Sequence, residues 1–280
     1  MGTRDARSIG SDSTTSTVEC VGEQNKMNPV KQPLHGRVAL VTGASGGIGS
    51  AVCTELLRLG CTVHAIALGD THLDALRERS DPSNVRIHPL DVTDTAALAS
   101  IVAEVKPDIL VNNAGIIGAL TGAQTYDPTI ADALIDINLR SAVHATLAAL
   151  PHMVARNHGH VVFTGSIAAT RPTANTAVYS ATKAGMSAFA DGLRMDLFGT
   201  MIRVTVLAPG RVETHLYDDL HGGHRGAKQA LYSTAVAIQP QEIATLVGVA
   251  LTMPQHVDVT RLEVVPTAQV YGGAAIAPCS

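Results

Sequence analysis

Short apolar runs alternate with longer stretches of helical periodicity from about residue 37 onward. Seven of these runs are predicted to be strands, at 38–41, 63–66, 85–87, 109–111, 160–163, 204–207 and 262–265. Most are continuously apolar and do not alternate with polar residues, which is typical of strands that are buried on both faces. The pattern therefore predicts an α/β fold with a single Rossmann-type, doubly wound parallel sheet and helices on both of its faces.

The first 35 residues show no such periodicity. They are rich in Ser, Thr, Gly, Asn and Pro, so we predict that residues 1–35 form a disordered amino-terminal extension. Met27 is an alternative start of the protein. The remaining residues, 36–280, are predicted to form one domain, because 46% hydrophobic residues in a chain of 280 suit one large core better than two small ones.

The composition of the chain indicates what kind of molecule the protein binds. The net charge is -4 and only 16% of residues are charged, so no basic surface indicates nucleic acid. No apolar run approaches the roughly 20 residues that span a membrane, and the amino terminus has no signal-peptide core. We therefore expect a cytoplasmic protein with a small-molecule partner and no membrane partner. Its cysteines, Cys20, Cys53, Cys61 and Cys279, lack a CxxC spacing and are predicted to be free thiols.

A glycine-rich turn follows the first predicted strand. Gly43, Gly47 and Gly49 lead into a helix that begins near Ile48. Glycine permits a tight turn and lets the backbone approach a pyrophosphate, and a helix amino terminus favours an anion. The turn therefore predicts a dinucleotide site. Its spacing, G-xxx-G-x-G, differs from the general G-x-G-x-x-G fingerprint, so a tight turn without a ligand is the alternative.

A tyrosine and a lysine stand four residues apart downstream, at Tyr179 and Lys183, and Ser166 closes the fifth predicted strand. On a helix, residues four apart share one face. A cation beside a phenol favours the phenolate and lowers its pKa from about 10, toward the range in which it exchanges protons with an alcohol. The pair therefore predicts a tyrosine that acts as a general acid or base.

The motifs together resemble one known family. The runs Thr42–Gly49 (TGASGGIG) and Asn112–Gly115 (NNAG), the single residues Asn138 and Ser166, the Tyr179/Lys183 pair and Pro209-Gly210 resemble the short-chain dehydrogenase/reductase family over roughly residues 36 to 270. The segments 153–160, 193–197 and 264–269 are similar to its bacterial branch of NADP-dependent 3-hydroxy acid, or serine-type, dehydrogenases. Residues 36–280 are accordingly predicted to be a dinucleotide-binding catalytic domain.

The resemblance implies four catalytic residues. Ser166 is expected to hold the substrate oxygen, Tyr179 to exchange its proton, and Lys183 to grip the nicotinamide ribose as well. Asn138 is expected to hold a water that links Lys183 to solvent. The alternative for Asn138 is a buried polar residue that satisfies helix backbone, and for Ser166 an ordinary turn hydroxyl at a strand end.

The resemblance also implies the contacts of a nicotinamide cofactor. Asp91 is expected at the adenine, Asn113 to Gly115 near the adenosine ribose, and Val212 and Thr214 at the nicotinamide amide; a turn role ahead of Thr93 is the alternative for Asp91. The full set of predicted cofactor contacts is Gly43, Ser45, Gly47, Ile48, Gly49, Asp91, Val92, Asn113, Ala114, Gly115, Tyr179, Lys183, Pro209, Gly210, Val212 and Thr214.

The sequence leaves the choice between NAD(H) and NADP(H) open. The second strand ends at Ala67 and Leu68, where such folds often carry an acid for the ribose of NAD or have an arginine nearby for the phosphate of NADP. Nearby candidates are Thr71, His72 and Arg77 for a phosphate, and Asp70 for a ribose. The missing acid and the resemblance to the NADP-dependent branch favour NADP(H) slightly.

The substrate side has weaker signals. The polar, glycine-rich segment 213–233 is predicted to be a mobile lid. Arg171 and Arg211 follow strands and are candidates for binding a substrate carboxylate, with a solvated loop arginine as the alternative for each. The His221-x-x-His224 pair has no matching cluster of cysteines or acids, so no metal is predicted.

We expect an NAD(P)-dependent oxidoreductase, a short-chain alcohol dehydrogenase or carbonyl reductase, that interconverts a secondary alcohol and a ketone, with hydroxy acids as candidate substrates. A catalytically silent dinucleotide-binding sensor or scaffold is the alternative, although such a protein has little reason to keep all four catalytic residues. A dinucleotide-dependent epimerase or dehydratase would usually need a larger carboxyl-terminal region. The resemblance further implies a homodimer or homotetramer assembled through helices at 129–150 and 176–198.

Overall fold

The computed structural model describes residues 2, 32–68, 73, 81–233 and 236–270. The chain divides into two units, Met1–Lys31 and Gln32–Ser280, and every helix and strand assigned lies in the second. Most of the predicted extension lies outside the described residues, and so do Met27, Cys20 and Cys279. The domain boundary at residue 36 therefore stays a prediction. Cys53 and Cys61 are buried free thiols, as expected. Within the described part of the chain, no helix has the length and apolarity to cross a bilayer.

Seven strands form one parallel sheet in the order β3-β2-β1-β4-β5-β6-β7. They are β1 (Val38–Thr42), β2 (Thr62–Ala67), β3 (Val85–Pro89), β4 (Ile109–Asn112), β5 (Gly159–Thr164), β6 (Ile202–Pro209) and β7 (Arg261–Val264). Each lies where the apolar runs predict a strand, with ends that agree to within two residues. The strand order reverses between β1 and β4, so a ligand is expected beyond the carboxyl ends of these two strands.

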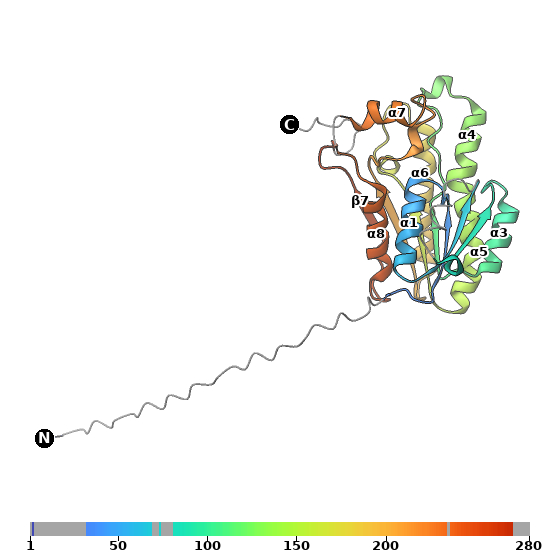
Figure 1. Cartoon of the computed structure of the whole chain (residues 1–280), viewed down its shortest axis with the longest axis vertical. Helices are drawn as coiled ribbons and strands as arrows, with labels where there is room; N and C mark the ends of the chain where they lie inside the picture. Colours follow the sequence, from blue (N-terminus) through green and yellow to red (C-terminus); the bar gives the residue numbers. More distant parts are fainter. Residues whose placement is uncertain (1, 3–31, 69–72, 74–80, 234–235, 271–280) are drawn as a thin grey trace. The chain divides into compact units, whose positions relative to one another are not determined.

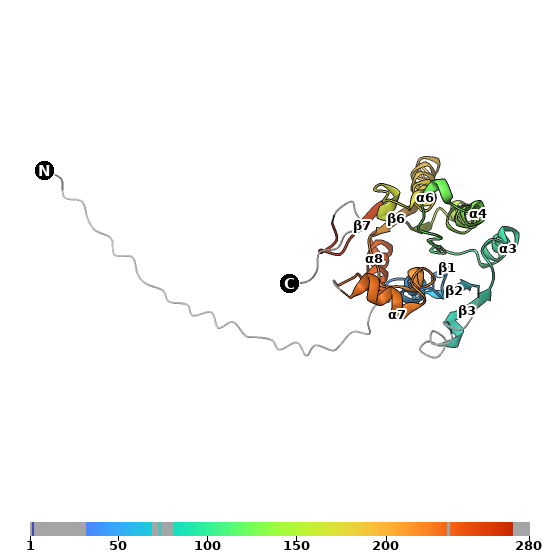
Figure 2. The same cartoon turned by 90° about the horizontal axis from the view of Figure 1, so that it is seen from above.

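Helices cover both faces of the sheet. They are α1 (Gly47–Arg58), α3 (Thr95–Val105), α4 (Pro128–Ile135), α5 (Ser141–Ala155), α6 (Ala177–Asp196), α7 (His224–Ala227) and α8 (Pro240–Thr252). Short turns of 3₁₀-helix lie at η1 (Pro82–Asn84), η2 (Ala123–Thr125), η4 (Ile167–Ala169) and η5 (His215–Tyr217), and π-helical turns at η3 (Asp136–Arg140) and η6 (Lys228–Tyr232). Figures 1 and 2 show α8 and α6 on opposite sides of the sheet. The doubly wound arrangement is confirmed.

Two apolar layers explain why the strands lack polar alternation. The layer on one face joins strand residues such as Val63 to Leu56 of α1 and Ile243 of α8. The opposite layer joins Leu110 and Phe163 to residues of α3, α5 and α6. Every residue of β5 and β6 is buried as a result. A sheet with both faces covered needs apolar side chains at consecutive positions, and this is the pattern seen in the sequence.

Candidate active site

A cavity of about 790 Å³ lies at the carboxyl edge of the sheet. Residues that follow β1, β3, β4, β5 and β6 line it, as the reversal of strand order predicts. The cavity gathers all of the predicted catalytic, cofactor and substrate residues except Asn138 and Gly49. Those it contains are Gly43, Ser45, Gly47, Ile48, Asp91, Val92, Asn113, Ala114, Gly115, Ser166, Arg171, Tyr179, Lys183, Pro209, Gly210, Arg211, Val212 and Thr214.

The turn after β1 needs glycine at two positions for different reasons. Gly43 has a φ of 64°, and a Cβ atom there would lie 2.7 Å from the Cα of Ala114. A Cβ atom at Gly49 would lie 2.1 Å from the carbonyl oxygen of Gly43, so Gly49 is a packing position beneath the turn. Helix α1 begins at Gly47, with Gly46 preceding it without any side-chain cap, and both glycines line the cavity. This open helix amino terminus fits a pyrophosphate.

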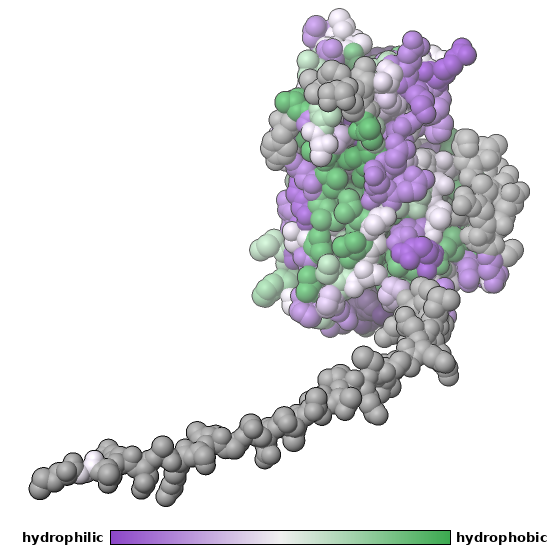
Figure 3. All heavy atoms as spheres, turned by 60° about the vertical axis from the view of Figure 1, so that its left-hand side comes forward, coloured by the Kyte–Doolittle hydropathy of each residue, from purple (hydrophilic) through white to green (hydrophobic). Residues whose placement is uncertain are grey.

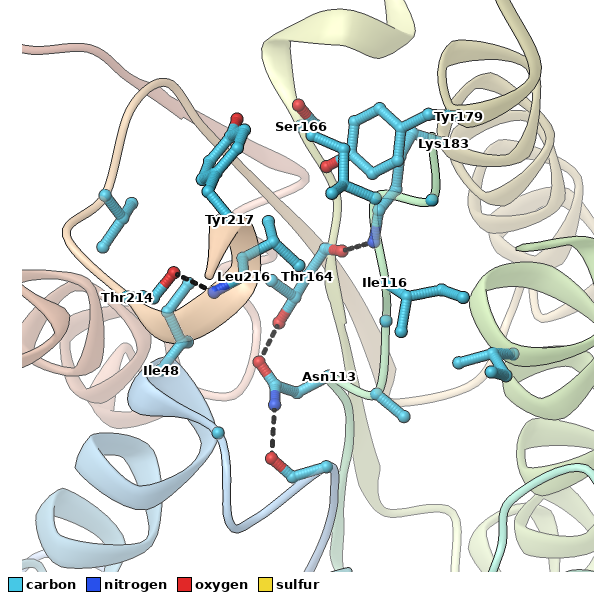
Figure 4. A pocket seen from close by; sticks show the side chains of 18 of the residues that line it. Ile48, Asn113, Ile116, Thr164, Ser166, Tyr179, Lys183, Thr214, Leu216 and Tyr217 are labelled. Atoms are coloured by element: carbon cyan, nitrogen blue, oxygen red, sulfur yellow. Dashed lines mark hydrogen bonds between the residues drawn. The ribbon is translucent and has the colours of Figure 1, made fainter. Parts of the chain in front are cut away.

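Hydrogen bonds fasten the glycine turn to the neighbouring strand ends. The hydroxyl of Thr42 accepts from the amides of Asn113 and Ala114 at 3.0 and 3.1 Å. The side-chain amide of Asn113 donates to the carbonyls of Thr42 and Gly43, each at 3.1 Å. Thr164 completes the series by donating from its hydroxyl to Asn113 Oδ1 at 3.2 Å (Figure 4). These bonds to the ends of β1, β4 and β5 therefore fix the shape of the turn. The roles of Thr42 and Thr164 in it were not predicted from the sequence.

The end of β3 and the end of β2 form another wall of the cavity. Asp91 lines it, and its Oδ1 also accepts from the amide of Thr93 at 2.9 Å, so the alternative role in a turn is present as well. Ala67 and Leu68 line the same cavity and bring no charge to it. Asp70, Thr71, His72 and Arg77, the other candidates for this end of a cofactor, lie outside the described residues.

Ser166 and Tyr179 meet at the other end of the cavity (Figure 4). Ser166 follows β5 and caps η4, where its Oγ accepts from the amide of Ala168 at 3.1 Å. Its hydroxyl also acts on the Tyr179 side chain, where it opposes the rise of the phenol's pKa. Tyr179 lies in the first turn of α6. The predicted turn role of Ser166 and its place beside the phenol therefore coexist, and two hydroxyl groups converge on one side of the cavity.

The direction of the Tyr179 pKa differs from the sequence expectation. Burial raises this pKa above its usual value and the neighbouring Tyr217 adds to the rise, while Ser166 acts in the opposite direction. The expected lowering of the pKa by Lys183 is absent, because Lys183 is not among the groups that shift it. Its Nζ lies 5.9 Å from the centre of the Tyr179 ring and donates to the carbonyl of Thr164 at 2.9 Å. The phenol is therefore protonated at neutral pH.

Lys183 is itself almost fully buried, and burial lowers its pKa to about 8. No carboxylate of the described residues forms a salt bridge with its ammonium group. The group lies beside Gly115, where a Cβ atom would be 3.4 Å from Lys183 Nζ and 3.3 Å from Asn138 Oδ1. A side chain at Gly115 would therefore crowd both polar groups, and the glycine leaves the cavity wall open in front of them.

Asn138 acts on the backbone behind the cavity. Its Oδ1 accepts from the amide of Ile116 at 2.8 Å, and its Nδ2 donates to the carbonyl of Ile116 at 2.9 Å and to Thr182 Oγ1 at 3.2 Å. The structure thus shows the alternative role, a buried polar residue that satisfies backbone, although this backbone belongs to the loop after β4 and not to a helix. Asn138 lies in the π-helical turn η3, which interrupts the helix predicted over 129–150.

Replacement of Lys183 by methionine is expected to stabilise the protein at neutral pH. The pKa of Lys183 falls from 10.5 to about 8 on folding, so the folded state carries a cost of up to about 3 kcal/mol below pH 8. Loss of the donor to Thr164 offsets part of the gain, and we expect Lys183→Met to unfold with a free energy higher by roughly 1–2 kcal/mol. Urea denaturation at pH 7 measures this difference.

The sign of the effect can be checked at higher pH. Between about pH 8 and 10.5 the unfolded chain binds a proton at Lys183 that the folded chain lacks, so wild-type stability rises relative to the variant. The difference between Lys183→Met and wild type should therefore shrink across that window. A difference that stays constant from pH 7 to 10 would contradict the assignment.

The two candidate substrate arginines both line the cavity but differ in their partners. Arg171 forms an ion pair with Glu263 of β7, with 2.6 Å between Nη1 and Oε1. Arg211 donates from Nη1 to the carbonyl of Leu231 at 3.4 Å, and its backbone amide donates to Gln269 Oε1 at 3.0 Å. Arg171 is thus held by an acid, and the guanidinium of Arg211 donates to a neutral backbone carbonyl.

The predicted lid segment, 213–233, supplies a further wall of the cavity through His215, Leu216, Tyr217, Asp219 and Leu220. Thr214 starts η5 by accepting from the amide of Leu216 at 3.3 Å (Figure 4). Figure 4 shows Tyr217 across the cavity from Ser166 and Tyr179. The sequence analysis placed a lid here and did not single out Leu216 or Tyr217 as wall residues, because an irregular segment has no periodicity to indicate which side chains face inward.

Comparisons with known proteins agree with this geometry. The family model for short chain dehydrogenase matches residues 37–223. An uncharacterised short-chain type dehydrogenase/reductase of Sinorhizobium fredii is 46% identical over 87% of this chain and 96% of its own length. The NADP-dependent 3-hydroxy acid dehydrogenase YdfG of Escherichia coli K12 is 35% identical over 84% of this chain and 97% of its own.

A solved structure of a dehydrogenase has a similar fold over most of this chain. The closed form of serine dehydrogenase complexed with NADP+ superposes with a TM-score of 0.79 at 35% identity, over 86% of this chain and 100% of the other. The parallel sheet, the glycine turn and the pocket that joins it to Ser166 and Tyr179 are thus accompanied by similarity over nearly the whole described domain. The chain belongs to the short-chain dehydrogenase/reductase family and is an NAD(P)-dependent oxidoreductase.

Proposed function

We propose that the protein interconverts a secondary alcohol and its ketone with NADP(H) as the preferred cofactor and a hydroxy acid or its keto form as substrate. One observation carries the proposal: a single cavity runs from the glycine turn at Gly43 to the paired hydroxyl groups of Ser166 and Tyr179. The turn fits the pyrophosphate of a dinucleotide, and the hydroxyl pair fits a carbonyl oxygen. No feature of the described site favours the silent sensor or scaffold.

The mechanism divides the work between two hydroxyl groups. The Ser166 hydroxyl holds the substrate oxygen, and Tyr179 gives its proton to that oxygen as the carbonyl is reduced. The raised pKa of Tyr179 keeps the phenol in the protonated form that this step requires. Lys183 would hold the ribose of the bound cofactor, and Asn138 fixes Ile116 in the loop after β4. The hydride is supplied by the nicotinamide.

The preference for NADP(H) rests on the relatives and on β2. The YdfG relative is NADP-dependent by name, and the serine dehydrogenase structure contains NADP+. Ala67 and Leu68 bring no carboxylate to the cavity, and an acid there would repel a 2′-phosphate. Separate fluorescence titrations with NADPH and NADH test the preference. Tighter binding of NADH would overturn it, and a screen of hydroxy acids against simple and cyclic alcohols with the tighter cofactor tests the substrate class.

Replacement of Arg211 is expected to separate acidic from neutral substrates. If its guanidinium binds the carboxylate of a hydroxy acid, Arg211→Gln should raise the KM for hydroxy acids about tenfold or more, because a charge-assisted hydrogen bond contributes about 1.5–3 kcal/mol. The KM for a neutral secondary alcohol should change little. Arg171→Gln is the matched control, since it removes the other arginine that lines the same cavity.

Steady-state kinetics on both substrate classes decides between the two arginines. An equal change in KM for acidic and neutral substrates in Arg211→Gln would show a structural effect instead of carboxylate recognition. A selective change in Arg171→Gln and none in Arg211→Gln would assign recognition to the residue beside β7.

We also propose that the protein forms a homodimer or homotetramer through the predicted stretches 129–150 and 176–198, which fall on α4, η3, α5 and α6. Leu147 of α5 is 54% exposed, and Phe198, just after α6, is 91% exposed. Figure 3 turns the side with β7 and α8 toward the viewer and shows an apolar band along it, which offers a second surface of this kind. Light scattering after size exclusion tests the assembly, and Leu147→Asp should lower the measured mass. A monomeric wild type would contradict this assembly.

Two further expectations stay predictions: that the protein is located in the cytoplasm, and that residues 36–280 form the catalytic domain.

A further inference from the structure

Three potential metal ligands converge within the lid segment, and one of them, His215, also lines the cavity. His215, Asp218 and His224 each direct a ligand atom to the same place, and these atoms all lie within 4.8 Å of one another. The Asp218 carboxylate lies between the two imidazoles, with its Oδ2 2.7 Å from His215 Nδ1 and its Oδ1 3.3 Å from His224 Nδ1. The two imidazole rings are tilted by 42° relative to each other, with 4.4 Å between their centres.

The backbone brings these ligands together before any ion binds. His215 lies in η5 and His224 begins α7, and the chain between them folds back through Gly222 and Gly223 with φ values of 68° and 104°. The carbonyl of Asp218 accepts from the amides of His221 and Gly223 at 3.1 and 2.8 Å, which closes this loop. The convergence is therefore built by the fold and does not depend on a chance meeting of long side chains.

We propose that His215, Asp218 and His224 bind one Zn²⁺ ion. Two imidazole nitrogens and one carboxylate oxygen are ligands that zinc accepts, at about 2.0–2.2 Å each, which places neighbouring ligand atoms roughly 3.3 Å apart around a tetrahedral ion. The 3.3 Å between His224 Nδ1 and Asp218 Oδ1 matches this spacing, and His215 Nδ1 lies 2.7 Å from the other oxygen of the same carboxylate, so a small shift of this side chain would admit the ion. Each Nδ1 binds the ion through its lone pair while the imidazole proton resides on Nε2, and no redox change is involved. The His215 side chain is 59% exposed, so water supplies the fourth ligand.

The sequence analysis predicted no metal because it considered His221 and His224 as the ligand pair. The structure instead pairs His224 with His215, nine positions earlier, and adds the carboxylate of Asp218. His221 is not a member of this set. An ion at the site would fix η5 against α7, and with them the wall of the cavity formed by Leu216 and Tyr217. The cluster is separate from Ser166, Tyr179 and Lys183, so binding of the ion does not depend on the proposed reaction.

Calorimetric titration of ZnCl₂ into the tag-free, full-length, EDTA-treated protein tests the proposal. We expect one Zn²⁺ per chain, and His224→Ala and Asp218→Asn should each weaken binding by at least about tenfold, since even the loss of a supporting residue around a metal costs about that much. His221→Ala is the matched control and should bind as wild type does. Zinc should also raise the melting temperature of wild type and of His221→Ala, and leave that of His224→Ala unchanged.

A second metal gives an independent readout of the ligands. Co²⁺ in a site of low coordination number gives visible absorption, which should appear in wild type and be lost in Asp218→Asn. Melting curves without metal confirm that each variant is folded. The proposal is overturned if wild type binds no Zn²⁺, if His224→Ala and Asp218→Asn bind it as wild type does, or if binding is lost instead on replacement of Cys20 and Cys279.

Discussion

Tyr179→Phe is expected to lower kcat by about a thousandfold or more while the dissociation constant for NADPH changes little. General acid or base catalysis by one positioned side chain contributes about 10²–10⁴ in rate, and the phenol is the one proton donor proposed for the substrate oxygen. The variant keeps the ring, which lines the cavity and packs near Lys183. The measurement is single-turnover reduction of a ketone substrate, with cofactor binding followed by fluorescence in the same preparation.

Tyr126→Phe provides the matched control, because it removes a phenol hydroxyl from a residue outside the cavity. Its kcat should stay within about twofold of wild type, because substitutions away from a functional site usually have small effects. A Tyr179→Phe protein that keeps more than a tenth of wild-type turnover would rule out the proposed proton transfer. A protein that loses cofactor binding in parallel would show that the tyrosine hydroxyl acts on the cofactor instead.

Gly49→Ala is expected to destabilise the protein by about 3 kcal/mol and to weaken NADPH binding. A Cβ atom at this position would lie 2.1 Å from the carbonyl oxygen of Gly43, and backbone at both positions must move to accept it. The movement reaches the turn that is fastened to Asn113. Intrinsic helix propensity acts the other way, since alanine is favoured over glycine inside a helix by about 1 kcal/mol. Loss of stability would therefore identify the contact as the cause.

Gly46→Ala serves as the comparison in the same turn. Gly46 has a φ of -72°, and its Cβ atom would lie 3.4 Å from the same carbonyl oxygen, which is ordinary van der Waals contact. We expect its free energy of unfolding to change by less than about 1 kcal/mol in urea denaturation. Equal destabilisation by the two substitutions would show that the turn resists any side chain, and that the close approach at Gly49 has no special part.

Local signals explain what the sequence predicted correctly. The strands were recognisable because both faces of the sheet are covered, so each buried strand is a continuous apolar run. The glycine turn and the residues after the strand ends were recognisable because a parallel sheet brings its carboxyl ends to one edge. Eighteen of the twenty predicted site residues line the cavity for this reason.

The features that were missed depend on contacts between distant parts of the chain. The bonds of Asn138 to Ile116 join residues 22 apart, and Asn138 lies in a π-helical turn between two α-helices. The raised pKa of Tyr179 depends on burial and on Tyr217 across the cavity, neither of which the spacing of Tyr179 and Lys183 reveals. The approach of His215 to His224 depends on a backbone reversal at two glycines.

The hydrogen bonds of the cavity walls divide the molecule into a fixed part and an exchangeable part. Thr42, Asn113 and Thr164 tie the cofactor end to three strands of the sheet, whereas Asp218 ties the lid segment chiefly to itself. Residues 215–224 of this segment can therefore be exchanged for those of a relative with another substrate, while Thr214, the proton donor and the nucleotide cradle keep their positions. For enzyme engineering, this segment is the natural unit of exchange, and the glycine turn is the part to leave untouched.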